Sequence, residues 1–232
     1  MNNLFANSGF KLSKEQESKF SSYYRLISEW NERTDITNIV EEKDVYIKHF
    51  LDSLLLHKSS LIKNESKLID IGTGGGFPGI PLKLLDESLE VTLLDSLNKR
   101  IKFLNCVVED LNLNKVYPIH ARAEEYARDK DYREQYDIAT SRAVADMRTL
   151  VEYCLAYVKP GGYFIAMKGP NFKEEVESAK NAIDIMGGRL ENIITYSLPE
   201  AYGDRSLIII KKIKRTPGRY PRGQGKPRSN PL

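Results

Sequence analysis

The sequence predicts an α/β fold, namely a mainly parallel, doubly wound sheet with an antiparallel edge strand and an N-terminal helical extension. Three observations carry this prediction. Apolar, strand-like segments alternate with helix-like segments, a glycine-rich turn follows the first of these strands, and the last two strands have no helix between them. Such alternation is typical of parallel strands covered by helices on both faces, whereas consecutive strands without a helix pair antiparallel.

The composition is that of a globular protein without a membrane span. The chain has 232 residues, of which 41% are hydrophobic, and this suffices for one α/β domain with additions. No segment approaches the roughly 20 apolar residues of a membrane helix, and the first residues lack the pattern of a signal peptide. Two cysteines without CxxC spacing and three histidines indicate neither a disulfide nor a metal site. We therefore expect a cytoplasmic monomer without a metal.

Residues 1–60 are expected to form the helical extension. Ser13 and Gln16 form a capping-box pattern, and apolar residues at three- and four-residue spacing follow from Phe20 to Trp30. Residues 45–56 form a second helix-like segment.

Residues 61–212 are expected to form the α/β domain. The predicted strands are short apolar runs at residues 67–71, 91–95, 116–120, 137–141, 163–168, 193–197 and 207–211. The predicted helices lie at residues 80–85, 98–111, 145–158 and 172–186. The last two strands form the antiparallel edge.

Residues 213–232 form a basic tail that is expected to be flexible. Eight Lys or Arg and no acid occur from residue 211 onward, which leaves 27 basic and 32 acidic side chains before it, a balance of −5. Four prolines and three glycines in "KKIKRTPGRYPRGQGKPRSNPL" favour an extended arm after Arg215 over a packed element. A cationic arm suits a polyanionic partner, and a merely solubilising terminus is the alternative.

The turn after the first strand, "DIGTGGGFPGIPL", indicates a cofactor that contains adenosine. Five glycines fall within the eight positions from Gly72 to Gly79. Ligands of doubly wound folds bind beyond the carboxyl ends of the strands. Two cofactor classes use such a turn, a dinucleotide with a pyrophosphate and S-adenosylmethionine, which has no phosphate.

Three residues favour S-adenosylmethionine. Counted from Gly72, the third position of the G-x-G-x-x-G pattern is Phe77, whose ring is expected to obstruct the close helix–strand packing that glycine permits. Pro78 removes an N–H donor that a pyrophosphate would use. Asp70, at the strand end, suits a cationic ligand and repels a pyrophosphate. An NAD-dependent oxidoreductase on the same half-fold remains the alternative interpretation.

Later strand ends supply further candidates. Asp95, in "LLDSLNKRIKFL", is placed to accept the ribose hydroxyls of either cofactor. Ala123 and Glu124, in "ARAEE", are expected beside the adenine, and Arg142, in "SRAVA", is expected where the transferred group meets the substrate. Glu124 as a helix-start acid and Arg142 as the partner of a carboxylate are the structural alternatives.

These motifs, with "HFLDSLLL" upstream, resemble the bacterial ribosomal RNA small subunit methyltransferase G family, also called the glucose-inhibited division protein B family. The resemblance runs from about Thr34 to Lys212. It implies a Rossmann-like class I methyltransferase fold, S-adenosyl-L-methionine as cofactor, and methylation of N7 of one guanine in 16S rRNA, either free or in the small ribosomal subunit. The cofactor contacts that it implies are Gly72, Phe77, Asp95, Ser96, Leu97, Ala123, Glu124 and Arg142.

The implied reaction needs alignment and no general base, because guanine N7 carries a lone pair and no proton. We therefore assign no catalytic acid or base and give Arg142 an orienting role. His49, Asp52 and Lys168 are candidate groups on the substrate side. A small-molecule methyltransferase and a non-catalytic RNA-binding module remain alternatives.

Overall fold

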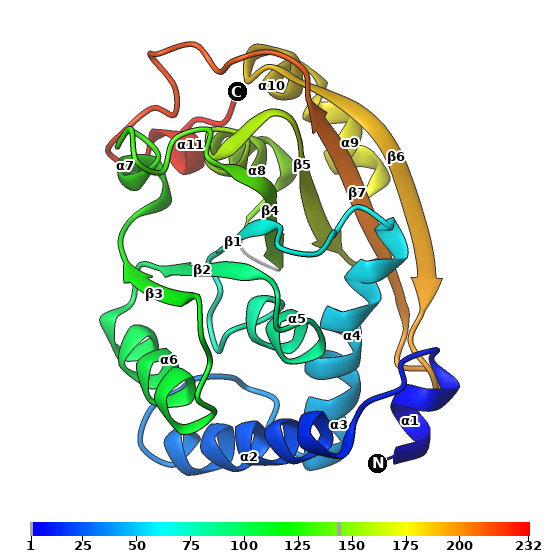
Figure 1. Cartoon of the computed structure of the whole chain (residues 1–232). Helices are drawn as coiled ribbons and strands as arrows, with labels where there is room; N and C mark the ends of the chain where they lie inside the picture. Colours follow the sequence, from blue (N-terminus) through cyan, green and yellow to red (C-terminus); the bar gives the residue numbers. More distant parts are fainter. Residues whose placement is uncertain (1, 143–144) are drawn as a thin grey trace.

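A seven-stranded sheet with the order β3-β2-β1-β4-β5-β7-β6 forms the centre of the protein (Figure 1). The structure is a computed structural model that describes residues 2–142 and 145–232, so two residues of the "SRAVA" motif lie outside the described part. Strands β1 to β5 run parallel, and β7 pairs antiparallel with both β5 and β6. The doubly wound sheet and its antiparallel edge are therefore confirmed.

Every predicted strand is present. The strands are β1 (Lys67–Ile71), β2 (Glu90–Asp95), β3 (Val116–His120), β4 (Tyr136–Arg142), β5 (Val158–Lys168), β6 (Gly188–Ser197) and β7 (Asp204–Lys212). Strand β5 begins five residues before its predicted start, in a stretch where Pro160 and two glycines indicate a turn. These residues occupy the irregular start of the strand, where a register shift interrupts the pairing with β4.

The helices depart more from the predicted bounds. They are α1 (Asn2–Asn7), α2 (Lys14–Asn31), α3 (Glu42–Val45), α4 (Asp52–Leu54), α5 (Gly79–Leu85), α6 (Asn98–Asp110), α7 (Ala123–Tyr126), α8 (Met147–Cys154), α9 (Lys173–Ser178), α10 (Lys180–Ile185) and α11 (Lys226–Ser229). The predicted helix at 45–56 is part of a longer helical segment that includes the π-helical turn η1 (Tyr46–Leu51) and the 3-10 turn η2 (Leu55–Ser59). The predicted helix at 172–186 is divided into α9 and α10.

Side chains alternate along the strands and divide the core into two clusters. Leu68 and Leu93 face α2, α5, α6 and the segment from α3 to η2. Ile69 and Leu94 point to the opposite face, which α8, α9 and α10 cover. This period of two is expected for parallel strands buried on both faces. Each fully buried Leu or Ile contributes about 1.5–3 kcal/mol.

Helix α2 fastens the N-terminal extension to the sheet domain (Figure 1). It begins at the predicted capping box, in which the Ser13 hydroxyl accepts the Gln16 N–H and the Gln16 side chain accepts the Ser13 N–H. The Gln16 amide also donates to two carbonyls at the end of α5. Farther along α2, the buried Tyr23 hydroxyl donates to the Gly75 carbonyl in the glycine turn. The extension thus supports the turn directly.

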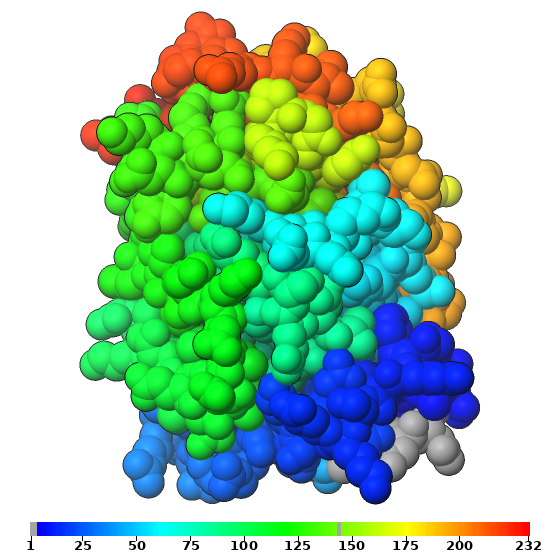
Figure 2. Space-filling view, viewed as in Figure 1, coloured from blue at the N-terminus to red at the C-terminus, as the bar shows by residue number. Residues whose placement is uncertain are grey.

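The C-terminal segment, residues 216–232, differs from the expected extended arm. It runs back across the molecule towards α7 and α8 and ends after α11, and Figure 2 shows its orange and red atoms packed on the body. Tyr220 and Pro227 are buried. Its prolines and glycines therefore produce an irregular but packed segment. Among the described residues, no helix is long and apolar enough to cross a lipid bilayer.

Candidate active site

Two adjoining cavities lie beyond the carboxyl ends of the parallel strands. The larger has a volume of about 800 Å³ and the smaller about 390 Å³. They share Gly72, Asp95, Ser96 and Arg228. All predicted cofactor residues line one or both cavities, with Phe77, Leu97 and Arg142 in the larger and Ala123 and Glu124 in the smaller. The described residues contain no cluster of three His, Cys, Asp or Glu that could hold a metal ion.

The glycine turn is fixed to β2 by its backbone. The N–H groups of Gly72 and Thr73 donate to the Leu94 carbonyl at 2.8 and 3.1 Å. Gly76 has φ +97°, and a Cβ there would lie 2.6 Å from the Tyr23 hydroxyl oxygen. Both its conformation and the close packing therefore require glycine.

The close approach of helix to strand occurs at Gly79. A Cβ on Gly79 would lie 2.4 Å from Cδ2 of Leu93 in β2. Phe77 is buried away from that contact, with its ring stacked on His49 at a centroid distance of 4.3 Å. The expected obstruction by Phe77 is therefore wrong, because the helix begins two residues later. Pro78 is the N-cap of α5 and has no N–H to donate, so the argument that it disfavours a pyrophosphate still holds.

Asp70 lies beneath the turn and lines neither cavity, so any effect of its charge on a bound ligand acts through the turn and not by direct contact. Its Oδ2 accepts the Thr73 hydroxyl at 2.7 Å and the Gly79 N–H at 2.9 Å, while Oδ1 has no hydrogen-bond partner among the described residues. Burial raises the pKa of Asp70 to about 6. Asp70 organises the turn from below.

Asp95 joins the first two loops of the site. Its carboxylate accepts the N–H groups of Gly74 and Leu97, both at 2.9 Å, and a guanidinium N–H of Arg100 at 3.2 Å. A carboxylate offers about four acceptor positions, so these three contacts leave capacity for a ligand hydroxyl. The geometry therefore fits a ribose at the junction of the two cavities.

The smaller cavity combines apolar walls with one buried acid. Ile71, Leu94 and Ala123 form part of the walls, and Glu124 at the start of α7 is 4% exposed. Tyr157 holds this helix in place by donating to the Ala123 carbonyl at 2.7 Å. A planar base with polar edges fits such a cavity.

A hydrogen-bonded network around Arg142 occupies the inner wall of the larger cavity. Nη1 of Arg142 donates to the Lys48 carbonyl at 2.8 Å and to Asp52 Oδ2 at 3.2 Å, and Nη2 donates to His49 Nδ1 at 2.9 Å. The guanidinium also lies 5.1 Å from the centroid of the Phe77 ring. Arg142 does pair with a carboxylate, as the structural alternative supposed, and it lines the cavity as well.

His49 is neutral in this network. A guanidinium only donates, so Nδ1 of His49 must accept, and its proton lies on Nε2, which donates to the Thr37 hydroxyl at 2.7 Å. Burial and the charge of Arg142 lower the pKa of His49 to about 3. Both ring nitrogens are engaged, so the geometry offers no histidine base at this point.

Asp52 connects the helical extension to the antiparallel edge. It is 3% exposed and accepts the Tyr196 hydroxyl of β6 at 3.0 Å, while Nε of Arg205 in β7 lies 3.8 Å away. Burial and the charge of Asp52 raise the pKa of Tyr196 far above its ordinary value. Three distant parts of the chain therefore meet at one buried carboxylate.

Lys168 lines the larger cavity but is already paired. Its ammonium donates to the Ala145 carbonyl at 2.7 Å and to Glu175 Oε2 at 2.6 Å. These contacts tie the end of β5 to the starts of α8 and α9. The role of Lys168 in this structure is therefore structural.

The residues that line the cavities but were not predicted as site residues include Thr37, Arg100, Arg205 and Arg228. Thr37 lies in a loop in which the Asn31 side chain accepts hydrogen bonds from the backbone N–H groups of Ile36 and Thr37. Arg100 lies one turn into α6, where a basic residue does not by itself indicate a binding site. Arg205 and Arg228 belong to segments without a motif. Of these four, Arg100 lies nearest in sequence to a predicted site residue, five positions after Asp95.

Comparison with known proteins places this site in a family. A family model described as rRNA small subunit methyltransferase G matches residues 16–207. The ribosomal RNA small subunit methyltransferase G of Lactobacillus johnsonii is 46% identical and aligns over 98% of this chain and 96% of its own length. That of Acetivibrio thermocellus is 50% identical over 97% of this chain and 92% of its own. The chain belongs to the rRNA small subunit methyltransferase G family.

Solved structures of more distant proteins agree with the fold of this family. A SAM-dependent methyltransferase from Aquifex aeolicus has a TM-score of 0.56 at 17% identity, covering 77% of this chain and 97% of that chain. M. jannaschii TYW2 in complex with AdoMet has a TM-score of 0.53 at 18% identity, covering 71% and 76%. The fold is a Rossmann-like class I methyltransferase fold, as the resemblance implies.

Proposed function

We propose that this protein transfers the methyl group of S-adenosyl-L-methionine to N7 of one guanine in 16S rRNA. Its family makes it an S-adenosylmethionine-dependent rRNA methyltransferase, and the position of methylation is the finer part of the proposal. The observation that carries this finer part is the network around Arg142. His49 and Asp52 are both held by ionic or hydrogen-bonded partners, so they suit an acceptor that loses no proton.

We place the cofactor across both cavities. The adenine lies in the smaller cavity beside Ala123 and Glu124, the ribose lies at Asp95 and Ser96, and the methionyl part enters the larger cavity along the glycine turn from Gly72. Leu97 fixes the carboxylate of Asp95 through its N–H. Phe77 supports His49 and Arg142 through its ring. The cofactor supplies an electrophilic methyl group on a cationic sulfur.

Arg142 orients a ligand without adding much net charge. A guanidinium has five N–H donors, and the contacts to Lys48, His49 and Asp52 use three, which leaves donors for a substrate or cofactor oxygen. Methyl transfer moves positive charge onto the guanine ring, and a strongly cationic site would oppose it. Asp52 compensates the charge of Arg142, so the two together suit this reaction.

Three cations that line the larger cavity favour a polyanionic substrate over a small molecule. Lys48, Arg205 and Arg228 come from three separate segments and line this cavity. Such cations raise the affinity of a protein for nucleic acid, because their contacts with phosphates release the counterions bound there.

The test is methylation with labelled S-adenosylmethionine, followed by mapping of the labelled nucleotide. The substrates are small ribosomal subunits and naked 16S rRNA, both from cells without the modification. We expect one labelled guanine, recovered as 7-methylguanosine, and the comparison of substrates identifies the form that is recognised. Label in another base, at another guanine atom, or only in small molecules would contradict the proposal.

A further inference from the structure

The C-terminal segment contributes to the walls of both cavities. Gly225, Arg228 and Ser229, in and just before α11, line the smaller cavity, and Arg228 also lines the larger one. The other residues that line the smaller cavity all precede residue 154. The fold therefore brings the end of the chain back to the strand ends that form the cofactor site.

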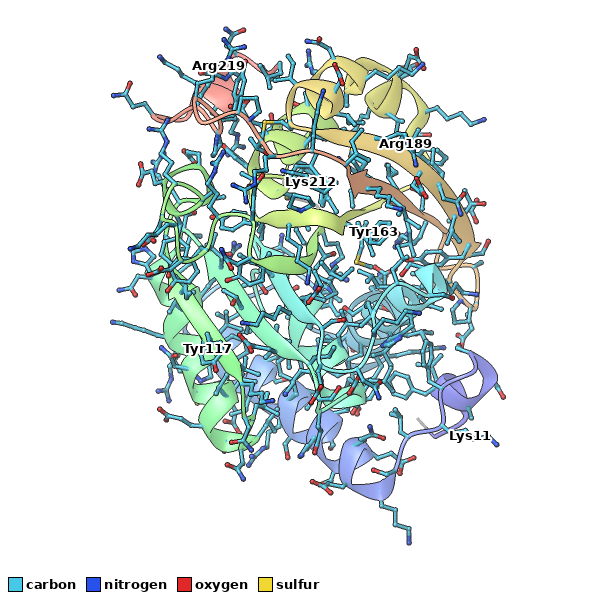
Figure 3. All side chains as sticks on the ribbon, turned by 45° about the horizontal axis from the view of Figure 1, so that its top comes forward. Lys11, Tyr117, Tyr163, Arg189, Lys212 and Arg219 are labelled. Carbon is cyan, nitrogen blue, oxygen red and sulfur yellow. The ribbon has the colours of Figure 1, made fainter. Side chains whose placement is uncertain are left out.

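Specific contacts anchor the start of this segment. The buried ammonium of Lys212, at the end of β7, donates to the hydroxyl of Thr216 and to the Leu155 carbonyl. Arg133 donates to the carbonyls of Thr216 and Tyr220 at 2.9 and 2.8 Å. Figure 3 shows Lys212 inside the fold and Arg219 at the surface of the segment.

Helix α8 anchors the part that reaches the cavities. Glu152 is fully buried and accepts the backbone N–H of Arg222 at 2.7 Å and its guanidinium at 2.7 and 3.0 Å. Three residues earlier on α8, and so on the same face, the Thr149 hydroxyl donates to the Pro227 carbonyl at 2.9 Å. A buried carboxylate that loses its cationic partner strongly destabilises the fold, so Glu152 holds Arg222 in this position. These contacts hold α11 beside the smaller cavity.

Arg228 differs in its charge environment from the other cations of the cavities. Each of the others has a carboxylate within 4.0 Å: Lys48, Arg100, Arg122, Arg142, Lys168 and Arg205. The guanidinium of Arg228 makes no ion pair or hydrogen bond with any described residue. Its donors are therefore free, at the junction where Asp95 and Ser96 also lie.

We propose that residues 225–229 form a wall of the cofactor site and that Arg228 donates hydrogen bonds to the bound cofactor at this junction. The inference rests on the placement of the cofactor proposed above. It gives the C-terminal segment a part in binding adenosine, in addition to any contact of its exposed cations with RNA. Removal of this wall must then weaken the binding of every ligand that contains the adenosine group.

The test compares Arg228→Ala with Lys226→Ala. Both substitutions remove one positive charge from α11, but only Arg228 lines the cavities. The probes are S-adenosylmethionine, S-adenosylhomocysteine and 5′-methylthioadenosine, which share the adenosine group and differ in the sulfonium charge or the amino-acid part. We expect Arg228→Ala to raise the Kd of all three by about tenfold, measured by calorimetry, and Lys226→Ala to leave them unchanged.

Two results would overturn this inference. Unchanged affinity of Arg228→Ala for all three probes, with weaker RNA binding, would make Arg228 an RNA contact only. Equal losses in Arg228→Ala and Lys226→Ala would indicate general electrostatic attraction and no wall. A second variant, Thr149→Val, removes the bond to Pro227 at nearly constant volume and is expected to raise the three Kd values in the same direction by a smaller factor.

Asp95→Ala separates this inference from the proposed placement of the cofactor. If Asp95→Ala loses affinity and Arg228→Ala does not, the placement stands and the wall is refuted. If Asp95→Ala retains full affinity for all three probes, the placement itself fails. Thermal unfolding of each variant identifies any loss of affinity that arises from misfolding.

Discussion

The smaller cavity is lined mainly by residues at or shortly after strand ends, whereas the larger cavity depends on hydrogen bonds and ion pairs between distant segments. Ala123 follows β3 within three residues, and Ser96 follows β2 at once. In the larger cavity, Arg142 meets His49 across 93 positions, and Tyr196 meets Asp52 across 144. Local motifs therefore locate a cofactor, but the groups that surround the substrate are positioned by the whole fold.

The two regions also differ in what holds them. In the smaller cavity, backbone hydrogen bonds from Gly72 to Leu94 and from Ala121 to Asp95 join neighbouring strand ends, and such bonds survive most side-chain substitutions. The network around Arg142 is held by buried charges, and removal of one partner leaves the other uncompensated. We therefore expect the larger cavity to be the more sensitive of the two to single substitutions.

The largest effect is expected for Asp52→Asn. The substitution keeps the volume but leaves Arg142 without a carboxylate in a buried site, which should cost about 3 kcal/mol of unfolding free energy in urea denaturation. The matched control is Asp44→Asn, which weakens the partly exposed pair with Lys48 and should cost much less, because solvent screens this pair. Similar losses in the two variants would refute the claim that buried charges hold the larger cavity.

A smaller effect is expected for Asp95→Ala. S-adenosylmethionine should bind about 2–3 kcal/mol more weakly, because charge-assisted hydrogen bonds to the ribose are lost and the contacts to Gly74 and Leu97 no longer order the loops. Glu90→Ala, at the opposite end of the same strand, serves as the control and should leave the dissociation constant unchanged. An unaltered affinity in Asp95→Ala would remove this residue from the site.

The third effect concerns Asp70 and depends on pH. Its pKa of about 6 lies above the ordinary value of 3.8, so the folded state retains a proton that the unfolded state has lost. The group therefore contributes stability below about pH 4 that disappears as the pH rises through about 6. In Asp70→Asn this contribution no longer titrates.

The measurement is the unfolding free energy of wild type and Asp70→Asn in urea, from about pH 4 to 7. As the pH rises, the wild type should lose stability relative to the variant, by roughly 1.4 kcal/mol for each unit by which the pKa is displaced. A pH-independent difference would show that Asp70 has the same pKa in both states. It would also weaken the assignment of this carboxyl as a buried support of the turn.

The sequence predicted the strand ends well for a physical reason. Buried parallel strands need apolar runs, and the loops that follow them need residues such as Gly72, Gly76 and Asp95 at fixed places. The same reasoning misjudged the packing of Phe77 and did not show that Asp70 lies beneath the turn, because spacing alone does not tell where a side chain points. The position of Gly79 against Leu93 became evident only in the packed fold.

The C-terminal segment could not be predicted from its own composition. Prolines and glycines exclude regular structure but say nothing about packing. Its order comes from residues that precede it in the chain: Lys212 donates to the Thr216 hydroxyl, Arg133 donates to backbone carbonyls of the segment, and Glu152 accepts from Arg222. The neutral state of His49 was equally inaccessible, because it depends on a π-helical turn facing a distant arginine.

The central claim is that the larger cavity acts by alignment and moves no proton, and the pH dependence of the single-turnover rate tests it most directly. At saturating S-adenosylmethionine and RNA, the rate should be nearly flat from about pH 6.5 to 8.5, because N7 has no proton to lose. His49, with its pKa of about 3, stays neutral throughout. Single replacement of His49, His57 or His120 should alter the rate without creating or abolishing a titration. A rate that rises about tenfold per pH unit below a pKa near neutrality, and loses that slope when one histidine is replaced, would contradict the account.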